Sequence, residues 1–166
     1  MSLVDRSLQR HGLAADRLTL EITETDIMDD PERAVEALAA LGALGVRRSV
    51  DDLGTGYSSL AYLSRFPLNE VKIDKSLVFA LTSDLASEAV VDAVIGLGRR
   101  LGRIVVAEGV EDIPTWQRLQ ELGADTAQGY VISRPMPADG VPDWLKEWDP
   151  ARLGAVNPAA SPAPGR

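Results

Sequence analysis

The chain has 166 residues, the size of one domain, and 45% of them are hydrophobic, so it can bury a core. It carries 25 Asp and Glu against 17 Lys and Arg, and this net charge of −8 argues against a DNA-binding protein with a basic face. The absence of cysteine and the single histidine, His11, argue against disulfides, thiolate metal sites and a Ser-His-Asp triad. No apolar run approaches the ~18 residues of a membrane span and no signal peptide opens the chain, so we expect a cytoplasmic domain.

Hydrophobic periodicity predicts strands and helices that alternate along the chain. The predicted strands alternate apolar and polar residues or form a short apolar run. Asp30 and Asp112 are predicted N-caps, and the three longer helices carry an apolar stripe. In chain order the predicted elements are a strand at 18–22, a helix after Asp30, a strand at 46–51, a short helix at 58–65, a strand at 70–74, a helix at 84–101, a strand at 104–107, a helix after Asp112, a weak strand within 124–130 and a helix at 139–148. In the long helix, we expect Val90, Val94, Leu97 and Leu101 to form the buried stripe.

Five alternations of strand and helix indicate an α/β fold built from right-handed βαβ units around a parallel sheet. Residues 150–166 contain four prolines and five alanines and have almost nothing to bury, so we expect a disordered tail there. The predicted organisation is therefore one folded domain at 1–149 followed by this tail.

Polar side chains gather at the C-terminal end of each predicted strand, which is where active sites form in parallel α/β sheets and barrels. Side chains on one strand alternate between its two faces, so the apolar neighbours of these polar residues point the other way, toward covering helices. A sheet that is polar on one face at its top suits a barrel mouth better than an open sheet covered on both sides. The residues concerned are Glu21, Asp51, Asp52, Lys72, Asp74, Glu108, Glu111 and Gln128.

Each of these residues also has an ordinary structural interpretation. Glu21 suits a solvated strand end, Asp51 and Asp52 a tight turn, Lys72 a structural ion pair, and Glu111 the start of a helix. Polar groups at five separate strand ends are much harder to explain in this way, and the functional interpretation is the one we adopt.

Converging carboxylates without histidine or cysteine suit a hard cation, Mg²⁺ or Mn²⁺. Adjacent aspartates normally point to opposite faces of a strand, so Asp51 and Asp52 serve one site only if the strand ends there and the chain turns, which Gly54 and Gly56 would allow. Two metals among acidic residues fit hydrolysis of a phosphodiester, with Lys72 orienting the water or a phosphate oxygen.

Five motifs in order resemble the EAL domain family, the phosphodiesterases that hydrolyse cyclic di-GMP to linear pGpG. The resemblance covers about residues 4–148 and implies a TIM-type (β/α) barrel. The motifs are Glu21-Ile-Thr-Glu24, Asp51-Asp-Leu-Gly-Thr-Gly-Tyr-Ser-Ser-Leu60, Val71-Lys-Ile-Asp-Lys75, Ala107-Glu-Gly-Val-Glu111, and Gln128-Gly-Tyr130 with Ser133-Arg-Pro135. In the second motif, Leu53 stands where Phe is commoner.

The resemblance also implies a role for each site residue. Glu21 and Asp51 would bind the first metal and Asp52 the second, and Glu108 is also counted among the metal ligands. Lys72 and Glu108 would surround the attacking water as the catalytic pair. Glu24 would anchor the loop from Asp52 past Tyr57, which the family uses in dimerisation and metal binding. Asp74, Glu111 and Gln128 would support the site.

The chain departs from the family by an absence at its start. A complete barrel needs about 250 residues, and five βα units are predicted here where eight strands are expected. The Glu-Ala-Leu segment is missing, with its metal-ligating Glu, its phosphate-contacting Arg and the Asn ligand of the next strand. We therefore expect an N-terminally truncated barrel with open sheet edges and an uncovered apolar interior, which would form a homodimer or oligomer.

Three functions stay open at this point. The first is a cyclic di-GMP phosphodiesterase that is complete only if the missing segment is supplied elsewhere. The second is a degenerate, non-catalytic EAL module that binds cyclic di-GMP or a protein partner in signalling. The third and weakest is an unrelated metal-dependent barrel enzyme.

Overall fold

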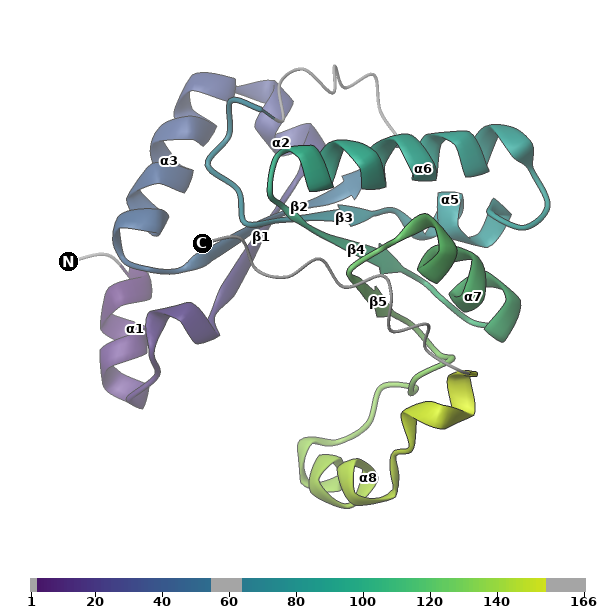
Figure 1. Cartoon of the computed structure of the whole chain (residues 1–166). Helices are drawn as coiled ribbons and strands as arrows, with labels where there is room; N and C mark the ends of the chain where they lie inside the picture. The colour runs from purple at the N-terminus through teal and green to yellow at the C-terminus, as the bar shows by residue number, and fades with distance from the viewer. Residues whose placement is uncertain (1–2, 55–63, 155–166) are drawn as a thin grey trace.

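The computed structural model of the chain describes residues 3–54 and 64–154. An α/β domain with a single parallel sheet accounts for most of these residues (Figure 1). The elements are α1 (Leu3–His11), the 3₁₀ turn η1 (Ala15–Arg17), β1 (Thr19–Thr23), α2 (Glu24–Asp29), α3 (Pro31–Ala43), β2 (Arg47–Leu53), β3 (Glu70–Ile73), α5 (Lys75–Ala80), α6 (Leu85–Arg100), β4 (Ile104–Glu108), α7 (Ile113–Leu122), β5 (Thr126–Gln128), η2 (Ala138–Gly140), α8 (Val141–Glu147) and η3 (Pro150–Leu153).

The strands follow one another in space in the order β1-β2-β3-β4-β5, and every neighbouring pair is parallel. Parallel neighbours need a connection that returns to the same end of the sheet, and helices provide it. Helices α2 and α3 connect β1 to β2, α5 and α6 connect β3 to β4, and α7 connects β4 to β5. The predicted parallel α/β architecture is thereby confirmed, and all polar strand ends lie at one edge of the sheet.

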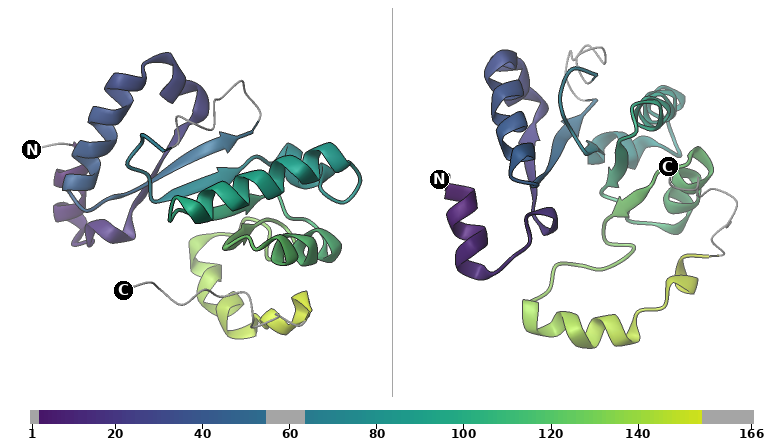
Figure 2. Two further views of the ribbon diagram at one scale, coloured as in Figure 1. Left: turned by 45° about the horizontal axis from the view of Figure 1, so that its top comes forward. Right: turned by 60° about the vertical axis from the view of Figure 1, so that its left-hand side comes forward.

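The hydrophobic core lies between the sheet and the helices arranged around it (Figures 1 and 2). Alternate strand residues such as Val50, Ile73 and Val105 face this layer and are almost completely buried. They pack in one cluster with Leu38 of α3 and Val94 of α6. Burying this surface is the main stabilising contribution to the fold, and it fixes which side chains must point the other way.

The opposite face of the sheet is polar. Apart from Ile104 and Val106, the side chains that the register places on it are Thr19, Glu21, Thr23, Arg47, Ser49, Asp51, Glu70, Lys72, Glu108, Thr126 and Gln128. Our expectation of an uncovered apolar interior is therefore wrong for the described strands. This face is polar instead of apolar because it carries the acidic site at its C-terminal edge.

The long helix α6 begins at its N-cap Asp84, where its start was predicted, but its buried face differs from the predicted stripe. Val90 is 38% exposed, and the buried residues are Val91, Val94, Ile95 and Gly98. A Cβ atom on Gly98 would lie only 2.3 Å from Cγ2 of Val105, so the helix approaches β4 most closely there. Because the helix packs closest at a glycine, its buried face is shifted by about one residue from the stripe that the large apolar residues predicted.

Helices α2 and α5 are short and escaped our sequence-based prediction. Both begin at a capped residue: the Thr23 hydroxyl accepts from the Asp26 amide, and the Asp74 carboxylate accepts from the Ser76 amide. The Thr23-x-x-Asp26 spacing is a capping-box-like signal that could have indicated α2. The predicted helix at 58–65 lies, except for its last two residues, outside the described residues.

The C-terminal part differs in its details from the expected helix and tail. Helix α8 is shorter than predicted and stands apart from the sheet, with Trp144 and Trp148 stacked at a centroid distance of 5.1 Å (Figure 1). The expected tail opens with η3, whose Leu153 is buried, and residues 155–166 lie outside the described part. In the described ranges, no helix combines the length and the apolar character that a membrane crossing requires.

Candidate active site

The Lys72 side chain is the centre of the candidate site. It extends from β3 on the polar face of the sheet and is only 6% exposed. Its Nζ atom lies 2.6 Å from Glu108 Oε1, 2.9 Å from Glu21 Oε2 and 3.4 Å from Asp51 Oδ1. One ammonium group thus joins carboxylates from β1, β2 and β4, and the structure brings together four of the residues that the sequence nominated.

A β-bulge in β2 places Asp51 and Asp52 at this centre. Val50 pairs with Val71 and Leu53 pairs with Ile73, so β2 uses three steps where β3 uses two. Asp52 takes up the extra step with a φ of +58°, a value that non-glycine residues seldom adopt. The predicted end of the strand at Asp51 is wrong, because β2 continues to Leu53, directly before Gly54, and the backbone turns at Asp52 within the strand.

The bulge gives the site a set of oxygen atoms suited to a hard cation. One carboxylate oxygen each from Asp51, Asp52 and Glu108 lies within 4.8 Å of the others. Carboxylate oxygens without sulfur or imidazole are the donors that Mg²⁺ and Mn²⁺ favour. The described residues therefore fit such an ion at this position, while Glu21 reaches the same centre through its contact with Lys72.

The electrostatics of the site follow from crowded carboxylates around one lysine. Burial disfavours the charged form of Lys72, but its hydrogen bonds to Glu108 and Glu21 outweigh this effect and raise its pKa above the ordinary value. Although Asp52 is exposed, partial desolvation by its neighbours raises the pKa of its carboxyl group, and the negative charges of Asp51 and Asp74 raise it further. The site is thus a cluster of negative charge with Lys72 as its balancing cation.

The Glu24 carboxylate anchors the segment that follows β2. Glu24 is the first residue of α2, it is buried, and its Oε2 accepts a hydrogen bond from the Gly54 amide at 3.1 Å. Gly54 has a φ of +101°, a conformation that strains any residue with a side chain. The resemblance predicted that Glu24 anchors this loop, and the structure describes the contact at its first residues, while 55–63 lie outside the described part.

The three residues that were predicted to support the site, Asp74, Glu111 and Gln128, occupy different positions in the structure. Burial opposes ionisation of Asp74, but its hydrogen bonds with Ser76 and Asp52 outweigh burial and lower its pKa, and the residue caps α5. Gln128 pairs with Glu108 across β4 and β5 on the polar face. Glu111 is exposed just beyond Glu108, and its side chain forms no hydrogen bond or ion pair with the described residues. Sequence reasoning missed Ser76, which an Asp-x-Ser cap would have indicated.

The segment after Glu108 is fixed by close backbone packing against the end of β5. The Val110 amide donates to the Gln128 carbonyl, and the Val131 amide donates to the Val110 carbonyl. Gly129 sits between these bonds, and a Cβ atom there would lie 2.2 Å from the Val110 carbonyl oxygen. Sequence reasoning quoted Gly129 only within a motif, and its role becomes visible only when the two strand ends are placed side by side.

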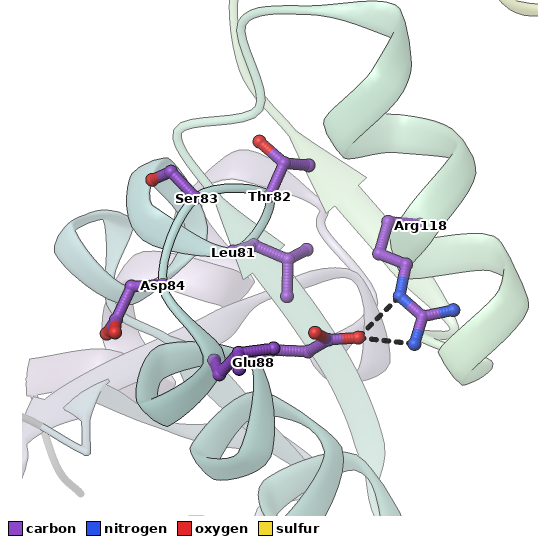
Figure 3. Close-up of a pocket in the computed structure, with 7 residues that line it drawn as sticks. Leu81, Thr82, Ser83, Asp84, Glu88 and Arg118 are labelled. Atoms are coloured by element: carbon purple, nitrogen blue, oxygen red, sulfur yellow. Dashed lines mark hydrogen bonds and ion pairs between the residues drawn. The ribbon is translucent and has the colours of Figure 1, made fainter.

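A cavity of about 300 Å³ lies away from this acidic centre, beside α6 and α7 (Figure 3). Its walls come from residues 81–85, Glu88 and Arg118, and Arg118 crosses it to form an ion pair with Glu88. None of the nominated site residues lines this cavity. The nominated residues therefore lie at the carboxyl ends of the strands and not around this cavity.

Comparison with known proteins identifies the family. The family model described as "EAL domain" matches residues 1–135. The chain belongs to the EAL domain family. Its Pseudomonas aeruginosa relative, "Bifunctional diguanylate cyclase/cyclic di-GMP phosphodiesterase MucR", is 44% identical over 136 residues, which cover 82% of this chain and 20% of the relative. "Cyclic di-GMP phosphodiesterase NbdA" of the same organism is 39% identical over 163 residues, covering 96% of this chain and 20% of NbdA.

Solved EAL structures show the same fold. "PaMucR Phosphodiesterase, c-di-GMP complex" superposes with a TM-score of 0.79 at 43% identity, covering 82% of this chain and 56% of that chain. "Klebsiella pneumoniae BlrP1 pH 9.0 manganese/cy-diGMP complex" gives 0.73 at 38% identity, covering 80% of this chain and 34% of that chain. The EAL domain described here is thus the α/β arrangement of a TIM-type barrel with five parallel strands. The chain spans about a fifth of the length of the two curated relatives.

Proposed function

We propose that this EAL chain takes part in metal-dependent hydrolysis of cyclic di-GMP to pGpG. The observation that supports this function best is the convergence of Glu21, Asp51 and Glu108 on Lys72 at the carboxyl edge of the sheet. The MucR and BlrP1 structures, whose titles name cyclic di-GMP complexes, share this fold at 43% and 38% identity. A phosphodiester is the substrate class that an acidic, cation-dependent centre serves.

Lys72 and Glu108 are the proposed catalytic pair. Their 2.6 Å contact places a hydrogen-bond donor beside an acceptor, from two adjacent strands that hold both backbones rigidly. The Lys72 ammonium can orient a water molecule or a phosphate oxygen, and the Glu108 carboxylate can accept a proton from that water as its oxygen attacks phosphorus. The bond from phosphorus to the 3′ oxygen then breaks, this oxygen takes up a proton from solvent to become a hydroxyl, and the ring opens.

Asp51, Asp52 and Glu108 are the residues that would hold Mg²⁺ or Mn²⁺, and we assign Glu21 to the same set because it reaches the same centre. A bound ion would lower the pKa of water and stabilise negative charge on the phosphate oxygens. It would also neutralise the acidic mouth, which otherwise repels a dianionic substrate. Asp74, Glu111 and Gln128 are proposed to support the site from α5, the β4–α7 turn and β5.

Hydrolysis by the full chain tests this function. Purified protein is incubated with cyclic di-GMP and Mn²⁺ or Mg²⁺, and pGpG is followed by chromatography. We expect product with either metal ion, no product in the presence of a chelator, and at least a ~100-fold loss of rate in Glu108→Gln because general base catalysis is removed. Glu36→Gln, on the exposed side of α3, is the matched control and should retain the rate.

The outcome of the assay separates the alternatives. Absence of product from folded chain would contradict turnover by these residues, and calorimetry with cyclic di-GMP would then distinguish a binding module from a chain without affinity. Metal-dependent activity on another substrate, without binding of cyclic di-GMP, would favour an unrelated barrel chemistry. Equal rates in Glu108→Gln and the wild type would contradict the role assigned to Glu108.

A further inference from the structure

The Lys72 ammonium shares carboxylate partners with the group of residues that could hold a metal ion. Two of its three carboxylate partners, Asp51 and Glu108, also belong to the group whose oxygens lie within 4.8 Å of one another. Lys72 Nζ lies 2.6 Å from Glu108 Oε1, so at least one lone pair suited to a metal is directed at the ammonium instead. The Lys72 side chain is also only 6% exposed, which limits how far it can withdraw into water.

We propose that Lys72 is the built-in counter-ion of this acidic cluster and competes with the divalent cation for the same carboxylates. This inference rests on the proposed function, since it concerns the metal that hydrolysis would need. It assigns to Lys72 a second role, separate from orienting water: it holds the strand ends together when no metal is bound, and it weakens metal binding when one is available.

The physical argument is a comparison of two charge-balanced states. Without metal, Lys72 neutralises part of a cluster in which Glu21, Asp51 and Glu108 would otherwise repel one another across three strands. With metal, two cations share the same carboxylates, so the ion must either displace the ammonium or bind beside it against like-charge repulsion. A free-energy coupling of this kind is reciprocal, so removing the charge of Lys72 should tighten metal binding.

The test measures metal binding and thermal stability without substrate. The full chain is titrated with Mn²⁺ by calorimetry, and its melting temperature is recorded with a chelator and with excess Mn²⁺. The variants are Lys72→Met and Lys72→Gln, which remove the charge, and Lys72→Arg, which keeps it. Lys146→Met is the matched control, because it makes the same change on the exposed face of α8, where Lys146 pairs only with Asp143 among the described residues.

We expect the neutral variants to bind Mn²⁺ at least tenfold more tightly than the wild type. They should melt at lower temperature in chelator and gain more from Mn²⁺ than the wild type does, because a ligand that binds the folded state stabilises it. Lys72→Arg and Lys146→Met should keep the wild-type affinity. If a neutral variant folds only when Mn²⁺ is present, the metal has replaced the ammonium, which supports the inference.

Other outcomes would overturn the proposal that Lys72 competes with the metal ion. Equal or weaker Mn²⁺ binding in both neutral variants would mean that Lys72 orders the carboxylates for the metal instead of opposing it. Neutral variants that stay unfolded even with Mn²⁺ would show that the ion cannot replace the ammonium. Wild-type hydrolysis together with either result leaves the proposed function intact. Absence of Mn²⁺ binding in every protein would contradict both.

Discussion

Two glycines with the same lack of a side chain have opposite surroundings in this structure. Gly129 faces the Val110 backbone so closely that a Cβ atom would lie 2.2 Å from its carbonyl oxygen and 2.4 Å from its nitrogen. Gly96, in α6, has no heavy atom within 4 Å of the position of such an atom. The first glycine is required by packing near the site, and the second only weakens a helix.

Substitution of these glycines by alanine should therefore change stability in opposite directions. Gly129→Ala forces two backbone segments apart and should lower the free energy of unfolding by about 1–3 kcal/mol or more. Gly96→Ala should raise it by about 0.5–1 kcal/mol through helix propensity. Urea unfolding followed by circular dichroism measures both. A Gly129→Ala protein as stable as the wild type would show that Val110 moves freely, which would also release the segment after Glu108.

At the same scale, the sequence predicted which residues would meet but not how they would do so. Glu21, Asp51, Lys72 and Glu108 lie at or directly after the C-terminal ends of predicted strands, and parallel pairing alone brings such residues to one edge. The approach of Asp51 and Asp52 to one centre depends on the bulge opposite Lys72 and on the positive φ of Asp52. Those features arise from the pairing of β2 with β3, which a single segment of sequence does not encode.

At the scale of elements, local hydrogen bonds define where helices begin. Asp84, the N-cap of α6, accepts from the amides of Ala86 and Ser87 and from the Ser87 hydroxyl. These bonds satisfy amides that have no partner within the helix, and they were predictable because they are local in sequence. The buried face of α6 was less predictable, since it depends on the approach of Gly98 to Val105 across 7 residues and two elements.

The N-cap predicts a specific dependence of stability on pH. The Ser87 hydroxyl and amide lower the pKa of Asp84 from its ordinary value of 3.8, so the folded state prefers the ionised carboxylate. Its stabilisation is fully present above the unfolded-state pKa and is lost as the pH falls through the lower folded-state value. Asp84→Ala should therefore reduce the melting temperature at pH 7, and its difference from the wild type should shrink below about pH 4.

Asp92→Ala is the control for this prediction. Asp92 is exposed in the middle of α6, away from the unpaired amides of the first turn, so its removal should not lower the melting temperature. A difference between Asp84→Ala and the wild type that persists unchanged at low pH would mean that the cap acts through something other than the ionised carboxylate.

At the scale of the whole molecule, the sheet has two edges whose protection differs. Among the described strands, β1 and β5 each pair on one side only. The β1 edge carries Glu21 with a half-exposed side chain, and inward-pointing charges of this kind discourage edge-to-edge pairing. The β5 edge, Thr126–Gln128, has no charged residue, so we expect it to pair more readily with a strand of another molecule than the β1 edge does.

This asymmetry predicts association of the chain through β5 and a substitution that weakens it. In size-exclusion chromatography with light scattering, the wild type should show a mass above the 17.8 kDa of one chain. Thr126→Lys adds a charge on the polar face of the β5 edge and should shift the mass toward that value, because pairing would bury the ammonium.

Thr82→Lys, in the exposed turn between α5 and α6, makes the same change away from the sheet and should leave the mass unchanged. A wild-type mass of one chain at every concentration would contradict association, and equal effects of the two lysines would show that net charge, and not the β5 edge, controls it.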